Sequence, residues 1–124
     1  MKYYLSLGSN INAEENMAFA IKELHKILSN VIISSTHKTR AEGFEGDDFL
    51  NIVVAGDSNL DFDNLNEKLK AIEDASGRNR DVPKFSARTL DIDIVLQIEN
   101  EEIIYESDEI AKYSFVSDPL KEII

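Results

Sequence analysis

Hydrophobic positions recur along the chain with two different periods, and each period predicts one kind of element. Two segments carry apolar residues at helical spacing, residues 12–29 and 61–77, and we expect an amphipathic helix in each. Asn12 stands where it can cap the first helix, and Ser76 and Gly77 are typical of the end of the second. Short aliphatic and β-branched runs predict strands at residues 2–7, 31–39, 49–56 and 89–96.

The order of these elements is strand, helix, strand, strand, helix, strand. This order predicts an α+β fold, a ferredoxin-like βαββαβ sandwich with an antiparallel sheet and its helices on one face. A length of 124 residues with 43% hydrophobic residues is that of one ordinary domain. We therefore expect a single domain spanning residues 1–124.

Composition excludes several classes of function. A formal net charge of -11 argues against a nucleic-acid partner, because the phosphates would be repelled. The chain has no cysteine and only two histidines, so disulfides and a zinc site are not expected. No apolar run approaches a membrane span, and the start shows no signal pattern. We expect a cytoplasmic protein with no membrane partner, as a monomer or a weak dimer.

Two acids in the last predicted strand are candidate metal ligands. In an extended run, Asp91 and Asp93 point to one face while Leu90, Ile92 and Ile94 point to the other. Two ionised carboxylates so placed repel each other, and oxygen-only ligands suit a hard cation such as Mg²⁺. Taken alone, such a pair is more often a solvated surface feature.

A cationic segment immediately precedes this strand. Its four basic residues against the one acid Asp81 make a local charge of +3; they are Arg78, Arg80, Lys84 and Arg88. Arginines next to a metal-binding pair suit a nucleoside triphosphate, since they neutralise phosphate oxygens while the carboxylates hold the bridging metal. The combination indicates nucleotide chemistry more specifically than either part.

The third predicted strand carries a candidate binding pair for a flat ring. Phe49 and Asn51 share one face, so the aromatic ring could stack on a heterocycle while the amide bonds its edge. On these residues alone the alternative stays open, with Phe49 in the core and Asn51 at a strand edge.

Four motifs occur in order, and they are Leu5-Ser6-Leu7-Gly8-Ser9-Asn10, Phe49-Leu50-Asn51, Gly77-Arg78-Asn79-Arg80 and the run Ala87 to Leu96. Together they resemble the 6-hydroxymethyl-7,8-dihydropterin pyrophosphokinases, the folate-pathway enzymes that move pyrophosphate from ATP to a pterin alcohol. The resemblance spans roughly residues 1–96.

The resemblance implies a role for each matching residue. Asp91 and Asp93 would hold Mg²⁺, in two ions, and would act in catalysis together with Arg78 and Arg88. Bound ATP would be contacted by Arg78, Arg80 and Arg88. The pterin would be bound by four residues: Thr39, Phe49, Asn51 and Phe115.

The tail departs from the family pattern. No histidine follows His37, and Lys112-Tyr113-Ser114-Phe115 stands where an Arg-Gly-Phe is usual. Two alternatives therefore stay beside the pyrophosphokinase reading. One is a catalytically weakened homologue that binds nucleotide and Mg²⁺, and the other is an enzyme with a different acceptor.

Overall fold

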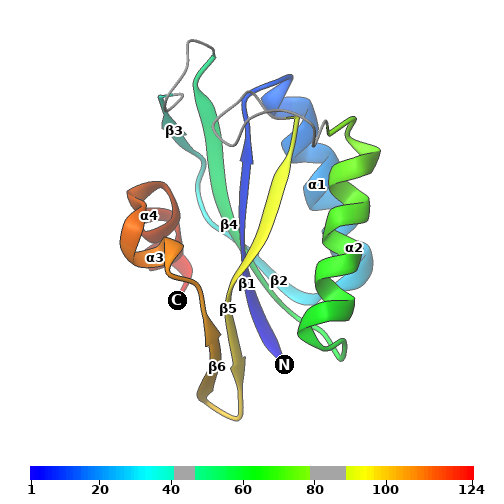
Figure 1. Cartoon of the computed structure of the whole chain (residues 1–124), viewed down its shortest axis with the longest axis vertical. Helices are drawn as coiled ribbons and strands as arrows, with labels where there is room; N and C mark the ends of the chain where they lie inside the picture. Colours follow the sequence, from blue (N-terminus) through cyan, green and yellow to red (C-terminus); the bar gives the residue numbers. More distant parts are fainter. Residues whose placement is uncertain (41–46, 79–88) are drawn as a thin grey trace.

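The structure is a computed structural model, and it describes residues 1–40, 47–78 and 89–124. The described part contains six strands and four helices (Figure 1). In chain order they are β1 (Lys2–Ser9), α1 (Ala13–Ile27), β2 (Ser29–Ile33), β3 (His37–Thr39), β4 (Phe49–Asp57), α2 (Phe62–Ala75), β5 (Asp91–Glu99), β6 (Glu102–Glu106), α3 (Glu109–Lys112) and α4 (Ser114–Ile123).

All strand pairs in the sheet are antiparallel, in the order β2-β4-β1-β5-β6, and β3 also pairs with β4. The two long helices α1 and α2 lie together on one face (Figure 1). The predicted α+β sandwich with an antiparallel sheet is confirmed, and its arrangement is compatible with the ferredoxin-like class.

The core on the α1 and α2 face follows the two periods of the sequence. Alternate strand residues point to this face because successive side chains of a strand point to opposite sides. The strands contribute Tyr3, Leu5, Leu7, Ile52, Val54, Ile92 and Ile94, and the helices contribute Met17, Ala20, Leu24, Leu65, Leu69 and Ile72. Leu90 joins the same cluster just before β5 begins.

The helix ends agree with the predicted positions but not always with the predicted contacts. Asn12 precedes α1 with a φ of 45°, and its side chain makes no capping bond; its backbone carbonyl accepts the Asn16 N–H at 2.9 Å instead. Asp61 caps α2 through its side chain, which accepts the Asn64 N–H at 2.9 Å. Gly77, with a φ of 88°, follows α2 in the left-handed region that favours glycine.

The predicted strand at residues 31–39 is wrong as one element, because it is divided into β2 and β3. Ser34, between them, is bonded to Val53 twice: its N–H donates to the Val53 carbonyl and its hydroxyl accepts the Val53 N–H, both at 2.9 Å. The Ser34 hydroxyl thus accepts a hydrogen bond that a backbone carbonyl would accept in a regular strand pair. The chain is not part of a strand again until His37.

The opposite face of the sheet is covered by elements that the sequence pattern did not predict. In Figure 1, α3 and α4 lie on the side away from α1 and α2. Val116 and Leu120 of α4 pack on a second apolar cluster, which the strands build from Tyr4, Val53, Ala55, Val95 and Leu96. None of the helices in the described part is long and apolar enough to cross a membrane.

Glu122, near the end of α4, attaches this helix to the segment that leads into β3. Its carboxylate accepts the N–H and the hydroxyl of Ser35, each at 2.8 Å, and pairs with Nε2 of His37. The backbone bond from Ser35 and the bonds from His37 and the Ser35 hydroxyl lower the pKa of Glu122 from 4.5 to about 2.

This lowered pKa predicts how stability depends on pH. A carboxyl whose pKa is lower in the folded state stabilises that state above its unfolded pKa, and the stabilisation is lost as pH falls toward the folded pKa. Glu122→Gln should therefore melt at a lower temperature than the parent chain at pH 6, and the difference should shrink between pH 4.5 and about 2. Circular-dichroism melts across this range would measure it.

Glu106→Gln is the matched control, since Glu106 is an exposed carboxylate in β6. A melting difference for Glu122→Gln that stays constant from pH 6 to about 2 would contradict the assigned role, because a pH-independent effect cannot come from the ionised carboxylate.

Candidate functional site

The first half of β5 has a strand neighbour on one side only within the described part. β1 pairs with β5 from Asp91 to Ile98, whereas the pairing with β6 begins at Leu96. The backbone groups of Ile92 that point away from β1 therefore have no strand to bond. An unpaired buried N–H or C=O is costly, so another group is needed at this edge.

Two side chains of α2 supply those bonds. Oε2 of Glu73 accepts the Ile92 N–H at 2.7 Å, and Nζ of Lys70 donates to the Ile92 carbonyl at 2.8 Å. The two side chains also form an ion pair with each other at 2.8 Å. At Ile92, two side chains of α2 thus make the hydrogen bonds that a neighbouring strand would otherwise make.

This arrangement explains why a carboxylate can be fully buried in the core. Glu73 has an exposed fraction of 0%, and it lies among the apolar residues of α2 because it follows Leu69 by four positions. A buried charge is tolerated when it is paired and hydrogen-bonded, and Lys70 and Ile92 provide both. The sequence analysis missed both residues, although an acid on the apolar stripe of a helix was a visible signal.

The two predicted acids lie beside this pair. Ligand oxygens of Asp91, Asp93 and Glu73 all lie within 4.8 Å of one another. Asp93 accepts a bond from Lys70 at 3.1 Å. Its pKa is raised to about 6, because partial burial and the nearby Asp91 charge both disfavour the ionised form more than Lys70 favours it. Closely held carboxylates of this kind are the donor set that a hard divalent cation prefers, so the residues fit Mg²⁺.

Lys70 is strongly held in its charged form. Partial burial alone would lower its pKa, but Asp93 and Glu73 together raise the pKa above the usual lysine value. The acidic cluster of Glu73, Asp91 and Asp93 therefore already contains one cationic group of the chain itself.

Of the three predicted arginines, the structure describes one. A guanidinium nitrogen of Arg78 lies 4.0 Å from a carboxylate oxygen of Asp91, and the Arg78 side chain is only 11% exposed. This places Arg78 directly beside the acidic cluster. Arg80 and Arg88 lie outside the described residues.

The predicted pterin residues are brought next to the acids by strand register. Gly8 of β1 stands between two partners, Asn51 on β4 and Asp91 on β5. Residues directly opposite each other in an antiparallel sheet point to the same face, so Asn51 and Asp91 flank Gly8 on the face away from α1 and α2. Because two strand spacings separate them, their backbones lie about 10 Å apart.

Gly8 leaves the middle of this row without a side chain. A Cβ atom added there would lie 3.3 Å from Oδ1 of Asn51 and 3.8 Å from a ring carbon of Phe49. Phe49 and Asn51 therefore do share a face and do adjoin the same point of the sheet, as the spacing predicted. The row of Asn51, Gly8 and Asp91 therefore has a polar side chain at each end and no side chain in the middle.

Thr39 is joined to Asn51. The Asn51 amide nitrogen donates to Oγ1 of Thr39 at 2.8 Å and lies 3.5 Å from the His37 carbonyl. Asn51 is only 4% exposed. The donor side of the amide is thus engaged inside the sheet, and no described residue donates to its Oδ1. The acceptor side of the amide lies toward Gly8.

Phe115 is not brought to this row by any described contact. Its ring stacks on that of Tyr113, with centroids 4.8 Å apart and planes at 19°. It also packs against the apolar cluster beneath α4. The predicted contact of Phe115 with a ligand stays a prediction.

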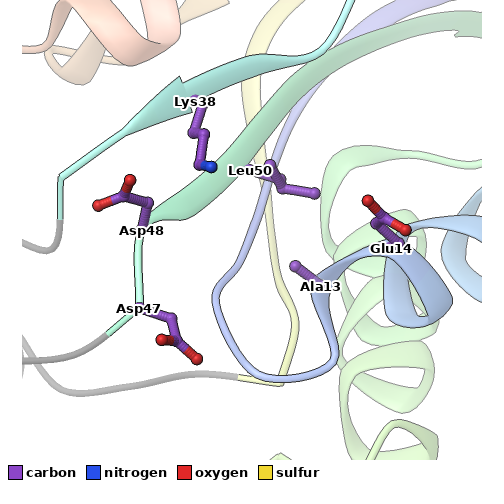
Figure 2. Close-up of a pocket in the computed structure, with 6 residues that line it drawn as sticks. All are labelled: Ala13, Glu14, Lys38, Asp47, Asp48 and Leu50. Carbon is purple, nitrogen blue, oxygen red and sulfur yellow. The ribbon is translucent and has the colours of Figure 1, made fainter.

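A pocket also lies at the end of the sheet beside the start of α1 (Figure 2). It is lined by Ala13, Glu14, Lys38, Asp47, Asp48 and Leu50. It contains none of the predicted site residues, and Leu50 belongs with the α1 face rather than with the row of Asn51 and Asp91. The strand register, and not this pocket, defines the candidate site.

The fold and the site together define an α+β protein with an acidic, arginine-flanked cluster at the β5 edge of an antiparallel sheet. A comparison with protein families places it more closely: the model of the 7,8-dihydro-6-hydroxymethylpterin-pyrophosphokinase family matches residues 4–124. The chain belongs to this family. The match includes the tail beyond residue 96, so the narrower extent expected from the motifs is corrected. Membership implies a pyrophosphokinase activity in folate biosynthesis, in a family that generally uses ATP and Mg²⁺.

The role of Glu73 at the β5 edge can be tested by its removal. Glu73→Ala should destabilise the fold by about 3 kcal/mol, because it leaves the buried Ile92 N–H without its acceptor and removes one of the two carboxylates that bond Lys70. Urea denaturation followed by circular dichroism would measure the change. Glu67→Ala, at an exposed position of the same helix, should change stability by less than about 0.5 kcal/mol. Equal effects of the two substitutions would contradict the assigned edge role.

Proposed function

We propose that the chain transfers the pyrophosphoryl group of ATP to 6-hydroxymethyl-7,8-dihydropterin and releases AMP, with Mg²⁺ held by Asp91 and Asp93. The observation that carries this proposal is the shared row of Asn51, Gly8 and Asp91. Such a transfer needs a ring-binding group and a phosphate-binding group at a fixed separation, and the two strand spacings provide it.

The acceptor ring would lie over Gly8. With no side chain there, a flat heterocycle can approach the sheet and contact the ring of Phe49. Oδ1 of Asn51 would accept an N–H of the ring edge, and the bond from Asn51 to Thr39 holds the amide in this orientation. The family implies the pterin as the ring, and the row supplies the geometry that supports it.

The acidic end of the row would face the phosphates. Mg²⁺ bound by Asp91 and Asp93 would neutralise the negative charge of the phosphate oxygens. Arg78 lies beside this cluster and would contact the same oxygens. By family resemblance, Arg80 and Arg88 join Arg78 at the nucleotide.

The transfer itself is a displacement at phosphorus. A bond forms between the hydroxymethyl oxygen and the β-phosphorus, and the bond from that phosphorus to the oxygen bridging to the α-phosphorus breaks. AMP leaves with the bridging oxygen, and the hydroxyl proton passes to water. Alignment and charge neutralisation dominate such a step, so fixed residues suffice and no dedicated base is required.

The decisive experiment measures AMP release from ATP with Mg²⁺ and the dihydropterin alcohol. Asp91→Ala and Asp93→Ala should each lower the turnover by about 100-fold or more, because each removes a ligand of the ion that neutralises the phosphates. Far-ultraviolet circular dichroism should remain like that of the parent chain.

Asp118→Ala is the matched control, at an exposed position of α4. Turnover of either site variant within about threefold of the parent chain would contradict a two-carboxylate metal site. Nucleotide binding without any AMP release from the parent chain would favour the catalytically weakened homologue, and release with another ring alcohol would favour a different acceptor.

The ring site predicts a ranking of two substitutions. Asn51→Ala leaves an N–H of the bound heterocycle unpaired and should weaken its binding by about 1–3 kcal/mol. Phe49→Leu keeps an apolar contact and loses only the ring stacking, at about 1 kcal/mol. Calorimetric titration with the pterin should therefore show that Asn51→Ala loses at least as much pterin affinity as Phe49→Leu. The nucleotide affinity of both variants should be nearly unchanged.

Phe115→Leu in the same titration tests the remaining predicted contact. Asn51→Ala with the pterin affinity of the parent chain would show that the ring is bound elsewhere. Unchanged affinity of Phe115→Leu would instead assign Phe115 to the α4 cluster alone.

A further inference from the structure

The position of Lys70 leads to an inference about how the acidic cluster binds metal, and it rests on the proposed assignment of Asp91 and Asp93 as metal ligands. Nζ of Lys70 contacts three acceptors: the Glu73 carboxylate at 2.8 Å, the Ile92 carbonyl at 2.8 Å and Oδ1 of Asp93 at 3.1 Å. An ammonium has three N–H donors, so these three bonds hold the charge in one place.

The Lys70 bond to Asp93 has a different character from the other two. The bonds to Glu73 and to the Ile92 carbonyl stabilise the edge of β5, and a neutral donor in the same place could make them too. Asp93, by contrast, is a predicted metal ligand with part of its side chain, 40%, exposed. A fixed positive charge 3.1 Å from one of its oxygens lies where it both neutralises this carboxylate and repels an ion that binds to it.

We propose that the Lys70 ammonium is a resident cation of the metal site, which weakens divalent-ion binding by the nucleotide-free chain. The three carboxylates carry a charge of -3, and the Lys70 ammonium offsets one unit of it, in addition to the unit offset by Arg78 beside Asp91. The charge available to attract metal is reduced, and an ion that reaches Asp91 and Asp93 meets a like charge.

The proposal predicts that metal binding strengthens when the charge of Lys70 is removed. Lys70→Gln should bind Mn²⁺ about tenfold more tightly than the parent chain, because a dication a few ångströms from a monocation is repelled appreciably even at high effective dielectric. Mn²⁺ titration of the nucleotide-free protein, followed by electron paramagnetic resonance of the free ion, measures this directly. The readout requires neither ATP nor transfer.

Matched variants separate charge from structure. Lys68→Gln removes the same formal charge from an exposed position of α2 and should bind Mn²⁺ within about twofold of the parent chain. Lys70→Arg keeps the charge and should bind Mn²⁺ as the parent chain does. Lys70→Met is a second neutral variant, and its Mn²⁺ affinity should increase as much as that of Lys70→Gln. If one of these two variants folds poorly, the other still tests the proposal.

Three results would overturn the proposal: neutral Lys70 variants that bind Mn²⁺ no more tightly than Lys68→Gln, a gain in Lys70→Arg equal to that in Lys70→Gln, or no measurable Mn²⁺ binding in any folded variant. Failure of the proposed function would give a different result: the parent chain would release no AMP, while the Mn²⁺ affinities of the variants would still differ as predicted here.

Discussion

The edge of β5 is the constraint on which the rest of the site depends. The first half of this strand must keep its extended form with β1 as its only strand partner in the described part, since β6 begins to pair at Leu96. Glu73 and Lys70 meet that need by bonding both backbone groups of Ile92. Strand geometry then places Leu90, Ile92 and Ile94 in the core and the acids on the other face. The ion pair of α2 therefore holds the strand whose alternation creates the acidic cluster.

A second consequence of the sheet is the separation of the two ends of the site. Asn51 and Asp91 come from strands 40 residues apart in sequence, and Gly8 between them fixes their relative position through backbone pairing alone. This use of a rigid sheet suits a reaction that depends on alignment, because strand spacing varies little while loops vary more. A side chain at position 8 would meet the Asn51 amide, which explains why glycine serves there.

Much of the fold could be predicted from the sequence, because the α1 and α2 face obeys the two hydrophobic periods. The opposite face could not be predicted in this way. α4 carries Val116, Leu120 and Ile123 at helical spacing, but it is short and contains Pro119, which normally argues against a helix interior. β6 has exposed residues throughout, so it lacks the alternation of a half-buried strand. At the site, the acids and the pair of Phe49 and Asn51 were found because a strand repeats every two residues. Lys70 and Glu73 were missed because an oppositely charged pair three residues apart in a helix resembles an ordinary surface pair, and the position of Glu73 four residues after Leu69 was the signal to the contrary.

The short strand β3 connects the least predictable part of the chain to the site. Its first residue, His37, pairs with Glu122 of α4, and its last residue, Thr39, accepts the bond from Asn51. All three residues of β3 pair with the start of β4, where Phe49 stands opposite Thr39. Packing of α4 against the sheet and orientation of the Asn51 amide are thus set through one small element. The tail diverges from the motifs of the family, yet its last turn holds the strand that orients a predicted ligand contact. Residues of α4 therefore contact the strand that adjoins the candidate site, and the family match extends over this part of the chain.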